Sequence, residues 1–175
     1  MRLELTRFGM IIAIVMLLPF ALFFTSEAPF GPSLVLYFCL FSLSLFDFLT
    51  YRLPNLLTLV LSLTGLLYIY TFVVYGAGDH LVGGLVGLLF FPVLNVGYKA
   101  LRGKDGIGMG DAKLLAGIGL WLGWTALPIV LFMSSVGGLI YAFIAQAVKN
   151  DTIPVAKIPF GPFLCFGCWI AWLYF

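Results

Sequence analysis

The sequence predicts an all-α polytopic membrane protein, on three observations. Of its 175 residues, 63% are hydrophobic and only 9% are charged, whereas soluble domains carry about a quarter charged residues. The mean hydropathy is +1.15. Apolar stretches near the roughly 20 residues that a helix needs to cross a bilayer follow one another along the chain. So few charges cannot cover a water-exposed surface, so most of the outside must face lipid, and we expect a single membrane domain over residues 1–175.

Seven apolar stretches approach spanning length, and segments containing proline or glycine separate them. They cover residues 8–24, 33–49, 55–75, 81–100, 111–127, 129–147 and 158–174. The fifth reaches Gly123 after about a dozen residues, or roughly 18 Å of helix, and cannot cross a core of about 30 Å alone. We therefore expect Asp111, which opens this stretch, to lie below the membrane surface.

The basic residues predict the orientation of the chain. With seven spans, all nine fall on the side of the N-terminus: Arg2, Arg7, Arg52, Lys99, Arg102, Lys104, Lys113, Lys149 and Lys157. The opposite loops contain only Glu27, Asp79 and His80 as titratable groups. Because cytoplasmic loops carry the excess of lysine and arginine, we expect a cytoplasmic N-terminus and an external C-terminus. The net charge of +2 is small and its basic residues are scattered, so no nucleic-acid partner is expected.

Counting residue types excludes several chemistries. His80 is the single histidine and lies on the external side, so a Ser-His or Cys-His nucleophile and a histidine-rich zinc site are excluded on the cytoplasmic side. The three cysteines, Cys39, Cys165 and Cys168, lie in apolar runs, where no disulfide framework is expected. Cys165 and Cys168 have C-x-x-C spacing, but their place within an apolar helix favours ordinary core packing. We expect neither a metal nor a cofactor.

Carboxylate chemistry remains. Of the seven acids, only Asp47 and Asp111 border long apolar helices on the cytoplasmic side, and ionisable groups at membrane depth are candidates for function. Two facing aspartates can share one proton, because like charges a few ångströms apart cannot both ionise. The ionised one can then act as general base on water while the protonated one polarises a peptide carbonyl.

Several alternatives stay open at this point. Asp111 follows glycines and could be a helix N-cap, and Asp47 could be a structural partner of Arg52. Asp105, in the glycine-bounded loop before Asp111, is a rival for the acid role. A proton-coupled transporter or channel would also use membrane-depth carboxylates, but it would need polar groups along a whole path. A purely structural membrane subunit would need no aspartate pair.

Glycines also recur at the four-residue spacing that suits close helix contact. Gly83 with Gly87, and Gly119 with Gly123, have this pattern, and we expect them to serve helix packing.

Three motifs carry a resemblance to a known family. Residues 108–115, G-M-G-D-A-K-L-L, resemble the G-x-G-D motif of the type IV prepilin peptidases, which are integral-membrane aspartic proteases. Residues 46–55, F-D-F-L-T-Y-R-L-P-N, resemble the other aspartate motif of that family, and residues 158–163, I-P-F-G-P-F, resemble its C-terminal signature. The resemblance covers a core of residues 33–175 and leaves 8–24 as an extra N-terminal helix.

This resemblance implies an endopeptidase that removes the short basic leader of type IV prepilins or type II secretion pseudopilins, at the cytoplasmic side of the inner membrane. The matching aspartates, Asp47 and Asp111, would be catalytic. The other motif residues, with a possible supporting role around the pair, are Arg52, Asn55, Gly108, Gly110 and Lys113. Bifunctional members carry a domain with two C-x-x-C pairs linked to N-methylation, which this sequence lacks. We therefore expect a short form with peptidase activity alone, and a separate methyltransferase partner stays open.

Overall fold

The computed structural model describes residues 26–102, 108–148 and 159–175, and these residues form helices without strands. The helices are α2 (Phe30–Thr50), α3 (Asn55–Phe72), α4 (Ala77–Arg102), α5 (Met109–Leu122), the short 3-10 helix η2 (Trp124–Ala126), α6 (Leu127–Val148) and α7 (Gly161–Tyr174). The all-α prediction is confirmed. The predicted first helix, residues 8–24, lies outside the described residues.

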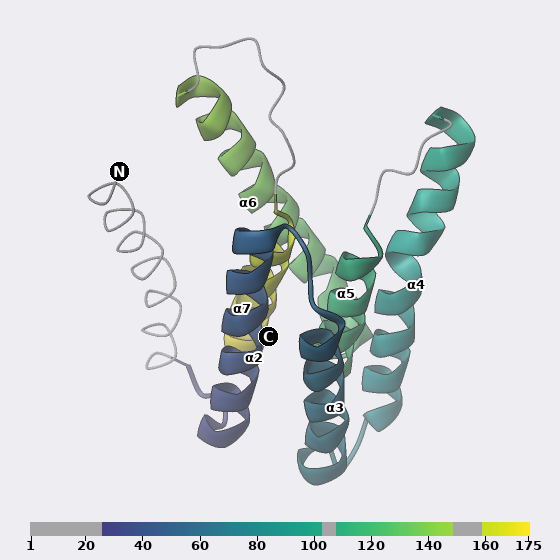
Figure 1. Ribbon diagram of the computed structural model, residues 1–175. Helices are drawn as coiled ribbons and strands as arrows, with labels where there is room; N and C mark the ends of the chain where they lie inside the picture. Colours follow the sequence, from purple (N-terminus) through teal and green to yellow (C-terminus); the bar gives the residue numbers. More distant parts are fainter. Residues whose placement is uncertain (1–25, 103–107, 149–158) are drawn as a thin grey trace.

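Consecutive α-helices run in alternating directions, so the bundle has two ends (Figure 1). By length and composition, α2, α3 and α4, together with the segment Trp124–Phe143 at the start of α6, can each cross a membrane. The two shorter helices, α5 and α7, have 14 residues each. The chain is therefore a multi-pass membrane protein with four candidate spans among its described residues, and the count of seven stays a prediction.

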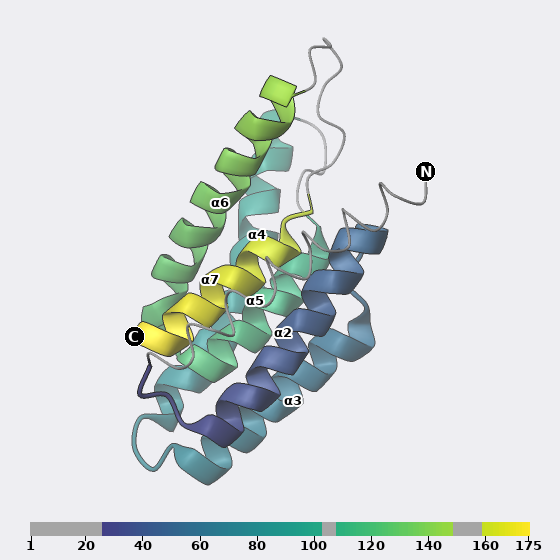
Figure 2. The same cartoon turned by 90° about the vertical axis from the view of Figure 1, so that its left-hand side faces the viewer.

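The short helix α5 occupies the middle of the bundle and packs against α3, α4, α6 and α7. In Figure 2 it lies behind α2 and α7, with α4 farther back. Its side chains are buried around most of the helix, namely Ala112, Leu114, Leu115, Ile118 and Trp121. A short helix enclosed in this way has its N-terminal turn inside the bundle, below the upper ends of α4 and α6 (Figure 1).

Five predicted boundaries, at residues 33, 75, 81, 127 and 158, differ from the observed helix ends by three to five residues. The fifth stretch was expected to reach Leu127, but α5 ends at Leu122 because Gly123 adopts φ 81°, a left-handed conformation that favours glycine. The last stretch was expected to begin at residue 158, but α7 begins at Gly161. Pro159 and Phe160 precede the helix without being part of it.

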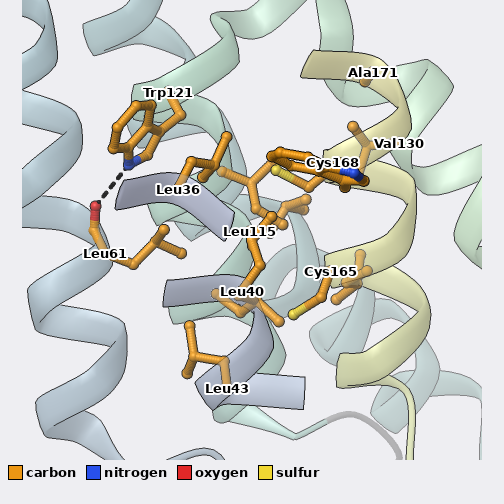
Figure 3. Packing of buried hydrophobic residues seen from close by; sticks show 14 of the residues in the cluster. Leu36, Leu40, Leu43, Leu61, Leu115, Trp121, Val130, Cys165, Cys168 and Ala171 are labelled. Carbon is orange, nitrogen blue, oxygen red and sulfur yellow. Dashed lines mark hydrogen bonds between the residues drawn. The ribbon is translucent and has the colours of Figure 1, made fainter. Parts of the chain in front are cut away.

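The core is built from the leucines of α2 and the buried faces of α5 and α7 (Figure 3). Trp121 of α5 donates its Nε1 hydrogen to the Leu61 carbonyl oxygen of α3, at 3.0 Å. This bond satisfies the one polar group of a buried tryptophan. Cys165 and Cys168 are free and lie inside this apolar cluster, so their prediction as core residues is confirmed.

Helices α4 and α5 approach each other closely at their glycines. A Cβ atom added at Gly83 would lie 2.5 Å from the Gly119 carbonyl oxygen, and one at Gly119 would clash with the backbone of Gly83. A Cβ at Gly87 would meet the backbone of Leu115 in the same way. The spacing predicted from the sequence thus serves close helix packing, and it fixes where the N-terminus of α5 lies.

Candidate active site

Four motif-bearing helix ends meet at one end of the bundle. They are the last turn of α2, which carries Asp47, and the first turns of α3, α5 and α7, which carry Asn55, Asp111 and Gly161. Figures 1 and 2 show the C-terminal end of α2 and the N-terminal ends of α5 and α7 at the same end of the molecule. The three sequence motifs, far apart in the chain, therefore converge.

Asp47 is a buried carboxylate, with only 6% of the residue exposed. Its Oδ2 atom accepts a hydrogen bond from the backbone N–H of Gly161, at 2.9 Å. Arg52, its suggested structural partner, is exposed, and over the described ranges no ion pair joins the two. The hypothesis that Asp47 serves to bind Arg52 is therefore wrong, since its partner is the backbone of α7.

Asp111 is the third residue of α5 and is half-buried. The N-cap position belongs to Gly108, and no side chain caps this helix. The hypothesis of an N-cap role for Asp111 is therefore wrong. Asp111 lies outside the four candidate spans. Burial, followed by the neighbouring charge of Asp47, raises the pKa of Asp111 to about 6.

The two aspartates thus lie close enough for the charge of one to affect the other, although 64 positions separate them in the chain. Cys165 of α7, fully buried between apolar neighbours, is within electrostatic range of both carboxylates. A pair of carboxyl groups in which one has a pKa of about 6 can take a proton from a water molecule and deliver one to a carbonyl oxygen.

The remaining motif residues connect the helices that carry the pair. Lys113 of α5 donates a hydrogen bond from Nζ to Asn55 Oδ1 of α3, at 2.7 Å. The Leu53 side chain lies against Gly110, where an added Cβ would come to 3.4 Å. The connection between α2 and α3 and the start of α3 therefore contact the start of α5, at residues one and two positions from Asp111.

Gly161 is part of this site, and the residue types of the sequence do not predict it. The I-P-F-G-P-F motif indicates only a family resemblance, and its residues do not indicate which atom they contact. Asp105, the rival for the acid role, lies outside the described residues. Within the ranges that the structure covers, no three His, Cys, Asp or Glu side chains are grouped so that they could hold a metal ion.

Comparison with known proteins gives consistent matches. The model of the type IV leader peptidase family matches residues 34–143, a segment that contains both aspartates. A protein of Aeromonas salmonicida (strain A449) named "Prepilin leader peptidase/N-methyltransferase" is 41% identical over 142 residues, which are 81% of this chain and 48% of that protein. Proteins of the same name are 37% identical in Escherichia coli (strain K12), over 83% of this chain and 68% of theirs, and 36% identical in Pseudomonas aeruginosa PAO1, over 86% and 51%.

The chain spans about half the length of most of the curated relatives that it matches. No solved structure matches it. The family match covers more than half of the chain and includes both motifs that carry the aspartates. The chain therefore belongs to the type IV leader peptidase family.

Proposed function

We propose that this chain is an aspartic endopeptidase that cleaves the leader peptide of type IV prepilins or pseudopilins. The observation that carries the proposal is the meeting of Asp47 and Asp111 at one end of the bundle, where the charge of Asp47 helps to raise the pKa of Asp111 to about 6. Family membership supports the substrate class, since the relatives are named as prepilin leader peptidases.

The proposed reaction is attack of water on the scissile peptide. One carboxylate takes a proton from a water molecule while the other, protonated, donates to the peptide carbonyl oxygen. The water oxygen bonds to the carbonyl carbon, and the C–N bond then breaks as the amine nitrogen takes a proton from the first carboxyl. The carbonyl oxygen returns its proton to the second, so both aspartates end as they began, and no metal or cofactor takes part.

Lys113, Asn55, Gly108 and Gly110 would support the pair. The Lys113–Asn55 hydrogen bond joins the start of α5 to α3, Gly108 is the N-cap of α5, and Gly110 packs beside the Leu53 side chain. Arg52 lies exposed at the same end of the bundle, where its positive charge would add to the electrostatic environment of the pair.

We place this end at the cytoplasmic side of the cell (inner) membrane. Arg52, Lys99 and Lys113 all belong to it, whereas Asp79 and His80 belong to the start of α4 at the other end, which follows the bias of basic residues toward the cytoplasm. Reporter fusions test this placement. Fusions at Gly78 and after Phe175 should both report an external location, and a cytoplasmic signal after Phe175 would show that the seven spans are miscounted.

The proposed function is tested with the purified protein in detergent and a prepilin that retains its leader. Mass spectrometry of the products should show one cleavage, between the basic leader and the apolar segment. Metal chelators and serine-protease reagents should leave the rate unchanged, because the mechanism uses neither a metal ion nor a nucleophilic serine. A protein that is folded but leaves every prepilin and pseudopilin tested intact would contradict the proposal.

A proton-coupled transporter or channel is not favoured. Such a protein needs polar groups along its whole length, and Asp79 and His80 at the opposite end are instead engaged by Trp124 and by the backbone of Leu120.

A further inference from the structure

The first turn of α7 has one backbone donor that its own helix cannot use. The N–H groups at the start of a helix lack partners within the helix. In α7, Phe163 and Leu164 both donate to the Phe160 carbonyl oxygen, at 3.1 and 3.2 Å, and Pro162 has no N–H. No side chain of Phe160 caps the helix. The Gly161 N–H is therefore the donor left over, and Asp47 Oδ2 accepts it.

The fit around Gly161 leaves no room for a side chain. A Cβ atom at this position would lie 2.6 Å from Asp47 Oδ2 and 3.0 Å from its Cγ. Any other residue would have to push the carboxylate away from the N–H that it accepts. Glycine is thus required by the contact with Asp47, 114 residues away in the chain.

We propose that Gly161 is a positioning residue whose N–H fixes Asp47 as the ionised member of the aspartate pair, so that Asp47 is the base that activates water and Asp111 carries the proton. A backbone N–H can only donate, and donation to a carboxylate favours its charged form. Over the described residues no backbone N–H donates to Asp111 in this way. The nearby charge of Asp47 disfavours ionisation of Asp111. This inference rests on the proposed function, because it assigns roles within that reaction.

The assignment gives each proton a direction. Water loses its proton to Asp47 as its oxygen bonds to the carbonyl carbon, and Asp111 gives its proton to the carbonyl oxygen. When the C–N bond breaks, the proton on Asp47 goes to the leaving nitrogen and the tetrahedral hydroxyl returns its proton to Asp111. The Gly161 N–H keeps Asp47 Oδ2 in place throughout, and the proton from water goes to Oδ1.

The contact itself can be tested without a substrate, in the full chain in detergent. Gly161→Ala should lower the unfolding temperature by at least about 3 °C, as overpacking of a filled site does. In an Asp47→Ala background most of this loss should disappear, because the two closest contacts are removed. Gly138→Ala is the matched control, since its Cβ would come no closer than 3.8 Å to any atom, beside the same Phe160–Phe163 segment. An equal fall in unfolding temperature in the wild-type and Asp47→Ala backgrounds would show that Gly161 does not contact Asp47.

The positioning role predicts a selective effect on turnover. Gly161→Ala should lower kcat for a prepilin by at least about tenfold and leave KM within about twofold, because the base is displaced while the binding surface stays. Gly138→Ala should keep both constants. A wild-type kcat in Gly161→Ala would refute the role. If the wild-type protein cleaves nothing, the proposed function and the role fail together, while the unfolding cycle still reports the contact.

The assignment of the proton is tested by difference infrared spectroscopy near pH 5. The carbonyl stretch of a protonated, buried carboxyl should be present in the wild type and in Asp47→Asn, and absent in Asp111→Asn. The Cys165 thiol, the other titratable group within range of both aspartates, does not absorb in that region. A band that is lost in Asp47→Asn and kept in Asp111→Asn would reverse the two roles.

Discussion

Both ends of the bundle contain acidic side chains, but the surroundings of these side chains differ. At the start of α4, Asp79 Oδ1 accepts the Trp124 Nε1 hydrogen at 3.1 Å, and His80 Nδ1 lies 3.0 Å from the Leu120 carbonyl oxygen. These polar groups bind the last turn of α5 and the short helix η2, so they hold the start of α4 against both. At the other end, Asp47 and Asp111 come from different helices, and the charge of Asp47 acts on Asp111.

The acids at the two ends differ in their burial and in the charge beside them. Asp79 is exposed and accepts a hydrogen bond from a neutral donor, the Trp124 indole N–H. Asp111 is half-buried and near a second carboxylate, an arrangement that weakens ionisation and that folding alone would not favour. Strongly perturbed groups of this kind gather at functional sites.

The largest expected effect is loss of cleavage when either aspartate of the pair is changed. Asp47→Asn and Asp111→Asn should each lower the rate of prepilin cleavage by about 10²–10⁴-fold, because an amide can neither act as base nor share a titrating proton. Asp79→Asn is the control from the opposite end and should stay within about twofold of wild type. Initial rates at saturating prepilin give the comparison. An equal loss of cleavage rate in Asp79→Asn would contradict the assignment of the reaction to the end that holds Asp47 and Asp111.

The next effect is on pH dependence, and its direction follows from the raised pKa of Asp111. If Asp111 must be protonated, kcat/KM should fall on the alkaline side with an apparent pKa of about 6, a value that belongs to the coupled pair. A profile of kcat/KM from pH 4.5 to 8.5 measures it. A plateau that extends to pH 8 would contradict the protonated role.

The same group should affect stability with a fixed sign. Because its folded pKa is raised above the unfolded value of about 3.9, Asp111 stabilises the fold fully below that value, and this contribution is lost as the pH rises through about 6. The unfolding temperature of the wild type should therefore fall across this window, and that of Asp111→Asn should fall less.

A smaller effect is expected from the hydrogen bond that joins α5 to α3. Lys113→Met keeps most of the side-chain length but removes the donation to Asn55 Oδ1. Because this bond is exposed, its loss should lower kcat/KM by only about two- to fivefold, or ~0.5–1 kcal/mol. Asn55→Ala should have the same effect, and the double variant should be no worse than either single one. Additive losses would mean that the two residues act separately.

The smallest effect on cleavage is expected at the opposite end. Trp124→Phe keeps an aromatic ring but removes the hydrogen donated to Asp79. The unfolding temperature should fall by about 2 °C, as expected for the loss of one exposed hydrogen bond, while kcat/KM stays within about twofold. A larger change in turnover than in stability would show that this end also takes part in the reaction.

The sequence alone predicted much of this arrangement and failed at identifiable places. Apolar length and turn residues placed six helices to within a few residues, and the glycine spacing anticipated the contact between α4 and α5. The place of Asp111 below the membrane surface, expected from the short run before Gly123, stays a prediction. The surroundings of Asp111 could not be predicted, because an aspartate after glycines is equally typical of an N-cap, and only the backbone shows that Gly108 takes that position.

The partner of Asp47 could not be predicted for a different reason. The nearest cation in the chain, Arg52, was the natural candidate, yet the actual partner is a backbone N–H 114 residues away. Because glycine has no side chain, its contacts cannot be predicted from side-chain chemistry. The pairing with Asp47 follows only from how α7 packs against α2. That packing explains why position 161 has no room for a side chain and why the Gly161 N–H, beside a proline that has none, is the donor to Asp47.

The central claim is that Asp47 and Asp111 act as one unit, and a rate cycle tests it most directly. Prepilin cleavage is measured for Asp47→Asn, Asp111→Asn, the double variant and Asp105→Asn, with correct folding checked by unfolding temperature. The double variant should be no slower than either single one, because removing one member of a unit already removes its function. Asp105→Asn should retain substantial activity. Near wild-type cleavage by either single variant, or loss of activity in Asp105→Asn with Asp111→Asn active, would contradict the central claim.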